Sequence, residues 1–174
     1  MHDNTLLKTE IQARIIKNPS EHTMNLAEEF GVSEAEVVRC LPDEMRTEAP
    51  ASDFETLWNT MTKWDKVTFI CRNAGAVVEV VGKLPQGNFG HGFFNLNDKD
   101  SALRGHLFAD RVGSIWLVSK PFFTMESHSV QFFDIDGNAM FSVYLGRDAK
   151  RQILESVRTD FLALRERYAT GRAA

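Results

Sequence analysis

Cysteine and long apolar runs are scarce in this sequence of 174 residues. The two cysteines, Cys40 and Cys71, form neither a CxxC pair nor the spacing of a structural metal site, so we expect no disulfide framework and no zinc. No stretch reaches the roughly 18 apolar residues of a membrane span, and the first residues alternate charged with apolar side chains, unlike a signal peptide. We therefore expect a cytoplasmic protein that does not insert into a membrane.

An excess of positive charge is also missing. Lys and Arg number 20 against 24 Asp and Glu, and the net charge of -4 argues against a general attraction for nucleic acids or anionic lipids. The motifs GxSxG, HExxH and Walker A are absent, and the stretch GNFGHG at 87–92 is followed by a strand signal instead of the helix that a phosphate loop needs. An apolar content of 43% remains, which is enough for a folded core.

The first part of the chain has the apolar period of helices. Helices are predicted from about residue 6 to Pro19, at 24–30, at 34–41 and, after a linker at 43–52, at 53–64. Ser33 and Glu36 form a capping-box pair. The second and third helices have the length of a helix-turn-helix, so a DNA-binding regulator is one alternative function. Glu34 and Glu36 argue against it, because they stand where the phosphates would lie.

From Lys66 onward the period of the apolar residues changes to two. Strands are predicted at 67–72, 76–81, 92–96, 103–108, 114–118, 129–133 and 139–145. Short turn signals between them favour an antiparallel meander, and an amphipathic helix follows from about 148 to 168. The predicted fold class is α+β: N-terminal helices, one large antiparallel sheet and a C-terminal helix. A single domain spans 1–174, helical over 1–50 and containing the sheet and last helix over 51–174.

Phenylalanine is frequent in the predicted sheet. The pairs are Phe93-Phe94, Phe122-Phe123 and Phe132-Phe133. Because successive side chains of a strand alternate, each pair places one ring on each face, and both faces must meet something apolar. Helices account for one face. A dimer partner, a flat apolar ligand or lateral core remain as alternatives for the other.

His106 is the histidine whose surroundings are most suggestive. In the strand at 103–108, alternation places Arg104, His106 and Phe108 on one face. An imidazole between an arginine and a phenylalanine, beside Gly105, which lets a flat molecule approach the backbone, suits a ligand of haem iron. A partly buried structural histidine is the alternative interpretation.

Arg72 ends a strand that is otherwise mostly apolar, just before the turn at 73–75. A cation at this place pairs with a carboxylate of its own chain or holds an anionic ligand such as a propionate. The sequence leaves both possibilities open.

Several motifs occur in an order that resembles one family. They are NLAEEFGVSEAEVVRCLP, FETLWNTMTKWDKVT, LPQGNFGHGFFNL, RGHL and MFSVYLGRDAKRQILESV. Together they cover about 25–157 and resemble the intracellular haem-utilisation carriers of Gram-negative bacteria, the HutX/ChuX type. The resemblance implies a cytoplasmic, homodimeric protein of iron acquisition that binds haem b as cargo. It also implies a dimer similar in fold to the two-half haem-handling proteins of the HemS/ChuS type.

The resemblance further implies the residues of a haem site. The histidine of the family's Gly-His-hydrophobic strand corresponds to His106, which we expect to be the axial ligand of the iron. Some members have a second histidine where this chain has Arg72, and the segment around Arg72 resembles the strand of the larger proteins whose arginine faces the haem. A weaker contact from Arg72, or one through a water, is therefore expected on the other side of the haem. Phe94 and Phe108 are expected to pack against the haem ring, and His91 is a reserve ligand.

Two haem-related functions follow as hypotheses. The leading one is a carrier or storage protein without enzymatic activity, which receives haem from one protein and passes it to another. One strong axial ligand with a weak contact on the other side suits both binding and release. The alternative is a haem-degrading enzyme of the HemS/ChuS type. No acid–base pair stands near His106 in the sequence, but oxygen activation on haem depends more on iron and ordered water than on side chains.

Overall fold

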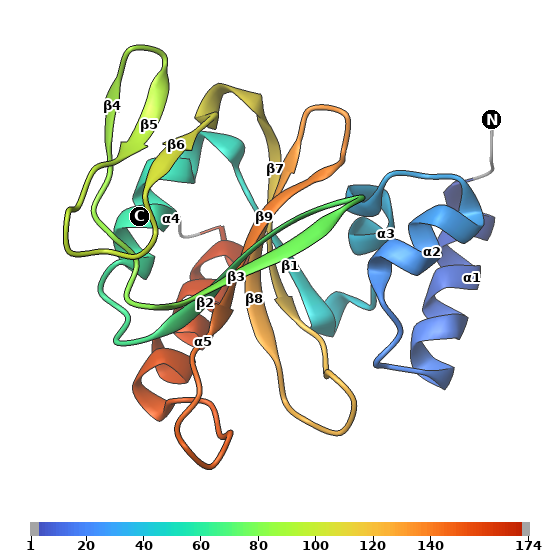
Figure 1. The fold of residues 1–174 in the computed structure, drawn as a ribbon. Coiled ribbons are helices and arrows are strands. Elements are labelled where there is room, and N and C mark those ends of the chain that lie inside the picture. The colour runs from blue at the N-terminus through green and yellow to red at the C-terminus, as the bar shows by residue number, and fades with distance from the viewer. Residues whose placement is uncertain (1–3, 172–174) are drawn as a thin grey trace.

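The computed structural model describes residues 4–171 and has an α+β fold, as predicted (Figure 1). The helices of this part are α1 (Asn4–Lys17), α2 (Thr23–Phe30), α3 (Glu34–Cys40), α4 (Phe54–Met61) and α5 (Glu155–Ala169). The strands are β1 (Arg46–Ala49), β2 (Val67–Asn73), β3 (Ala76–Gly82), β4 (Asn88–Gly90), β5 (Phe93–Leu96), β6 (Gly105–Leu107), β7 (Val112–Ser119), β8 (His128–Asp134) and β9 (Ala139–Leu145). None of these helices is long and apolar enough to cross a membrane.

The strands form two antiparallel sheets, where a single sheet was predicted. The larger sheet has the order β1-β7-β8-β9-β2-β3, and the smaller one has the order β4-β5-β6. Of the predicted meander, β7, β8 and β9 form one run of consecutive neighbours in the larger sheet. The β2–β3 hairpin joins this sheet through the pairing of β2 with β9, and the chain between β3 and β7 forms the smaller sheet.

Two segments have a different secondary structure from the one predicted. The linker predicted at 43–52 contains β1, an edge strand that pairs with β7 and buries Ala49. The four residues of this strand are too few to show a period of two. The last helix begins at Glu155 instead of about 148, because the carboxylate of Asp148 accepts backbone N–H bonds from Lys150 and Gln152 and holds them in a turn.

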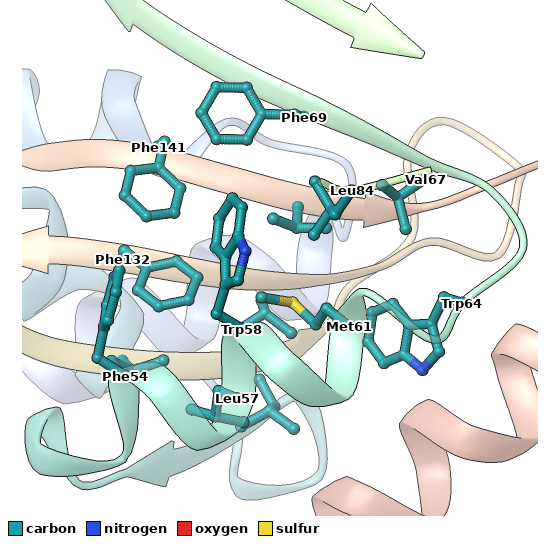
Figure 2. Close-up of a cluster of buried hydrophobic side chains, with 14 of the residues drawn as sticks. Phe54, Leu57, Trp58, Met61, Trp64, Val67, Phe69, Leu84, Phe132 and Phe141 are labelled. Atoms are coloured by element: carbon teal, nitrogen blue, oxygen red, sulfur yellow. The ribbon is translucent and has the colours of Figure 1, made fainter. Parts of the chain in front are cut away.

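The main core lies between the larger sheet and the helices α4 and α5. Trp58 of α4 is fully buried, and its indole N–H donates a hydrogen bond of 3.0 Å to the carbonyl of Pro85. Figure 2 shows Trp58 among the rings of Phe69, Phe132 and Phe141 from the sheet. The rings of Phe132 and Phe141 are stacked with 4.5 Å between their centroids. These aromatic contacts fix α4 on one face of the sheet.

The opposite face of the sheet is covered in part by α1, α2 and α3 (Figure 1). Trp116 and Val118 of β7 and Phe133 of β8 pack there, whereas Phe132 lies in the main core. The alternation predicted for the pair Phe132-Phe133 is therefore confirmed. It does not apply to Phe122 and Phe123, which belong to the exposed connection between β7 and β8.

The predicted start of α3 is confirmed, since the hydroxyl of Ser33 accepts a hydrogen bond of 3.3 Å from the backbone N–H of Glu36. This end of the helix packs against the sheet. The side chain of Glu34 is only 12% exposed, and a Cβ at Gly137 of the β8–β9 turn would collide with Ser33. The end that a helix-turn-helix would present to DNA is thus covered by the protein itself, which argues against the DNA-binding alternative.

Candidate functional site

The smaller sheet carries the predicted histidines on a hairpin and its neighbouring strand. His91 and Gly92 connect β4 to β5 with φ angles of 53° and 82°. Two consecutive residues with positive φ are the mark of a type I′ turn, which matches the twist of the strands that it joins. A Cβ at Gly87 would collide with the ring of Phe94, so this close approach anchors the start of the smaller sheet on the core.

The two faces of β5 have different environments. Phe94 is fully buried, and its ring lies 5.2 Å from that of Phe54 and 5.9 Å from that of Trp58. Its strand partner is Leu107, whereas the partner of His106 is Asn95. Paired residues share a face, so Phe94 belongs to the core and does not line the face of His106. The position expected for Phe94 beside the histidine is occupied by Phe93.

His106 lies on the open face of the smaller sheet. The alternation predicted for 103–108 is found: Leu103 and Leu107 pack towards the core, while Arg104, His106 and Phe108 are exposed. The ring of Phe93 lies 5.4 Å from the imidazole of His106 and 5.2 Å from the ring of Phe108. Gly105 has a φ of 142°, which side chains rarely allow, so the strand needs glycine just before the histidine.

The two nitrogens of His106 differ. Nδ1 lies 2.6 Å from Oδ1 of Asn95, the residue opposite it on β5. For Nε2, the structure of residues 4–171 shows no hydrogen-bond partner. One side of the imidazole is thus held by the protein, and the other is available to a ligand.

His91 and Arg104 are two further polar residues beside the smaller sheet. Both side chains are exposed, and neither forms an ion pair within the described part of the chain. His91 stands at the β4–β5 turn, and Arg104 lies two residues before His106 on the same face. A cation and two imidazoles therefore lie on the smaller sheet or directly beside its strands.

Arg72 lies elsewhere and has partners in its own chain. Its guanidinium forms an ion pair with the carboxylate of Glu34 at the start of α3, and the hydroxyl of Thr23 donates a hydrogen bond of 2.6 Å to the same carboxylate. Figure 1 shows the β2–β3 turn beside α2 and α3, on the other side of the molecule from β4, β5 and β6. The structure does not bring Arg72 and His106 together within one chain. Of the two possibilities open for Arg72, the geometry fits pairing with an internal carboxylate.

Arg104 was placed on the face of His106 from the sequence, but Asn95 and Phe93 were not identified as neighbours of this histidine. Part of this information is in the sequence. Alternation along FFNL places Phe93 and Asn95 on one face of the strand and Phe94 and Leu96 on the other. The sequence does not reveal which of the two sets faces His106, since this depends on the register between β5 and β6.

Residues 47–164 match a family model described as haem utilisation ChuX/HutX. The intracellular heme transport protein HutX of Vibrio cholerae serotype O1 is 33% identical over 162 residues, which are 93% of this chain and 84% of HutX. A solved structure of the heme-binding protein ChuX has a TM-score of 0.83 at 32% identity and covers 94% of this chain and 99% of its own.

A more distant structural neighbour is the heme-degrading enzyme ChuS of Escherichia coli O157:H7. It has a TM-score of 0.69 and 15% identity, and the match covers 94% of this chain but only 48% of ChuS. At this identity the likeness shows a shared fold alone.

Proposed function

Because this chain belongs to the haem utilisation ChuX/HutX family, we propose that it binds haem b and carries it within the cell, without breaking the ring. The proposal is supported by the names of two relatives, the intracellular heme transport protein HutX and the heme-binding protein ChuX. The observation that carries it is the exposed imidazole of His106, whose Nε2 has no partner within residues 4–171.

The open face of the smaller sheet supplies the kinds of contact that haem requires. Nε2 of His106 offers a lone pair to the iron, and the rings of Phe93 and Phe108 form an apolar wall beside it. The guanidinium of Arg104 is exposed on the same face and holds a propionate. His91, at the neighbouring turn, is the reserve imidazole.

A single strong ligand suits a protein that must also release its cargo. Arg72 is engaged by Glu34 and does not supply the weak contact on the second side of the haem. The second axial position is then left to water or to the next protein in the transfer. We propose that haem reaches and leaves this site through contact with a donor and an acceptor protein.

Transport, and not degradation, is the function that the relatives favour. HutX and ChuX are each more than 30% identical to this chain over most of its length, and their names describe transport and binding. The degrading enzyme ChuS shares the fold at 15% identity. A shared fold at this identity is no evidence that this chain degrades haem.

We also propose that two copies pair through β3. Among the described strands, β3 has a partner on one side only, and the side chains of Val77, Val78 and Val81 on it are more than half exposed. A long apolar edge strand tends to pair with another chain. The family resemblance implies a dimer similar in fold to the two-half proteins of the HemS/ChuS type, and ChuS is about twice as long as this chain, which covers 48% of it. Sedimentation should give a dimer for the wild type and a monomer for Val81→Lys, whereas Phe123→Ser, changed at another exposed site, should remain dimeric.

Titration with haemin, followed in the Soret region, tests the haem site. The wild type should saturate at one haem per chain, and His106→Ala should lose the Soret shift and bind roughly 100-fold more weakly, because the iron loses its axial ligand. A wild-type spectrum that stays that of free haemin at stoichiometric addition would refute the proposal. With ascorbate and oxygen the bound haem should persist, and its steady conversion to a linear tetrapyrrole would establish the degrading enzyme instead.

A further inference from the structure

We infer that Asn95 is a positioning residue that fixes the tautomer of His106 and thereby prepares Nε2 to bind iron. Only the last step, the use of Nε2 by haem, rests on the proposed function. The tautomer itself is a property of the haem-free protein, and it follows from the hydrogen bonds around the Asn95 amide.

The orientation of the Asn95 amide is fixed by three carbonyl groups. Asn95 is 7% exposed, and its Nδ2 lies 3.0 Å from the carbonyl oxygen of Gly90 and 3.3 Å from those of Asn88 and Phe93. Carbonyl oxygens only accept hydrogen bonds, so the atom facing them must be the N–H₂ group. The opposite orientation would place the amide oxygen against three other oxygens with no hydrogen between them.

The fixed amide determines which nitrogen of His106 carries the proton. With Nδ2 turned to the carbonyls, Oδ1 of Asn95 is the atom that lies 2.6 Å from Nδ1 of His106. An amide oxygen cannot donate, so Nδ1 must do so. A neutral imidazole has one N–H, and Nε2 is then left with its lone pair.

The arrangement also fixes the direction of the ring. Asn95 and His106 are direct partners in the β5–β6 register, and the ring of Phe93 lies against the imidazole with its centroid 5.4 Å away. The buried amide therefore holds one edge of an exposed ring. Metal-binding histidines commonly donate their other N–H to an oxygen of the protein, which orients the ring and makes the ligating nitrogen more basic.

The tautomer is measured without haem. Nitrogen-15 NMR of the haem-free protein, labelled at histidine and held at pH 8, should show the proton of His106 on Nδ1. Asn95→Leu removes the acceptor and should allow the Nε2–H form to appear, whereas Gln131→Leu, which removes another buried amide, should retain the Nδ1–H form. Wild-type protein with the proton of His106 on Nε2 would overturn the inference, whether or not haem binds. This wild-type result decides the matter even if a variant fails to fold.

Haem affinity then separates a positioning role from a merely structural one. Asn95→Leu should weaken haem binding by about 10- to 100-fold, the usual effect of removing a group that orients a metal ligand. In the His106→Ala background, Asn95→Leu should cause no further loss of haem affinity. In the protein that retains His106, it should lower the iron–histidine stretching frequency of the ferrous complex. Gln131→Leu, which removes another buried amide, is the matched control and should leave affinity and frequency unchanged.

Equal losses of affinity for Asn95→Leu in the wild-type and His106→Ala backgrounds would contradict the positioning role. If the wild-type protein does not bind haem at all, the proposed function fails, and the NMR experiment still tests the tautomer. The two failures are therefore distinguishable.

Discussion

His106 on β6 and His128 on β8 are both strand histidines, yet the structure gives them opposite environments. The imidazole of His128 is 7% exposed, its Nδ1 lies 2.8 Å from the hydroxyl of Ser119 and its Nε2 lies 2.7 Å from the carboxylate of Glu126. The imidazole of His106 is exposed and has one protein partner. A histidine can bind iron only through a nitrogen with a free lone pair, so of these two histidines only His106 is available as a ligand.

The hydrogen bonds of His128 connect the sheet to α5. Arg158 of α5 donates to the carboxylate of Glu126 at 2.7 Å, and Arg165 of α5 donates to the hydroxyl of Ser119 at 2.9 Å. The ring of His128 also lies 5.1 Å from that of Phe161 on the same helix. The comparison therefore separates a histidine that serves the fold from one that is left to a ligand.

The largest expected effect on stability is that of His128→Ala. Loss of the buried ring removes its packing on Phe161 and leaves Ser119 and Glu126 each without one partner, which should cost about 2–3 kcal/mol. Urea unfolding measures this loss, and haem affinity should be unchanged where the variant is folded. Loss of the Soret shift in folded His128→Ala would undo the distinction between the two histidines.

The second effect is a fall in stability on acidification. Burial lowers the pKa of His128, and the hydrogen bond that its ring donates to Glu126 opposes this only in part, so the folded state prefers the neutral ring. The unfolded chain, with a pKa near 6.5, then binds more protons, and stability should fall as the pH drops below about 7, by at most about 1.4 kcal/mol per pH unit.

A second group extends this dependence to lower pH. The hydrogen bond from His128 is the main cause that lowers the pKa of Glu126, and Arg158 adds to it. A carboxyl group with a lowered folded pKa stabilises the protein above its unfolded value and loses this contribution as the pH falls through the folded one. Urea unfolding at pH 8, 6 and 5 should show that the free energy of unfolding falls with pH, and that it falls less steeply in His128→Ala. Equal slopes for the two proteins would speak against the neutral buried ring.

A smaller effect is expected at Arg72. Arg72→Ala breaks the pair with Glu34 and should cost about 1 kcal/mol, because both side chains are partly buried. Haem affinity should stay within about twofold, and Glu34→Gln, which weakens the same pair from the other side, should behave alike. A large loss of haem affinity in Arg72→Ala alone would place the arginine in the haem site, as the family resemblance suggests.

The smallest effect is expected for His91→Asn. Asparagine followed by glycine is favoured in a type I′ turn, so stability should change by less than about 0.5 kcal/mol. The haem spectrum should not change if His106 is the ligand. A lost Soret shift in this variant, with the shift retained in His106→Ala, would exchange the roles of the two residues.

Much of the local structure could be predicted from the sequence. The strand at 139–145 was placed at its exact bounds, the cap of α3 was identified from Ser33, and the alternation around His106 was correct. These features depend on neighbours within a few residues of one another, and the side-chain period reports them directly. The choice of His106 as the ligand rests on this local pattern and on the family resemblance, and it stays a prediction.

The tertiary structure decided how distant segments meet. The division into two sheets, the strand at Arg46–Ala49 and the pairing of β9 with β2 join parts of the chain far apart in sequence. The same holds for the carboxylate that engages Arg72, and for the register that sets Asn95 and Phe93 beside His106 in place of Phe94. The sequence by itself determined which side chains alternate along each strand. Only the fold decided which partner each face received, because a shift of one residue in register exchanges the faces and leaves the local pattern unchanged.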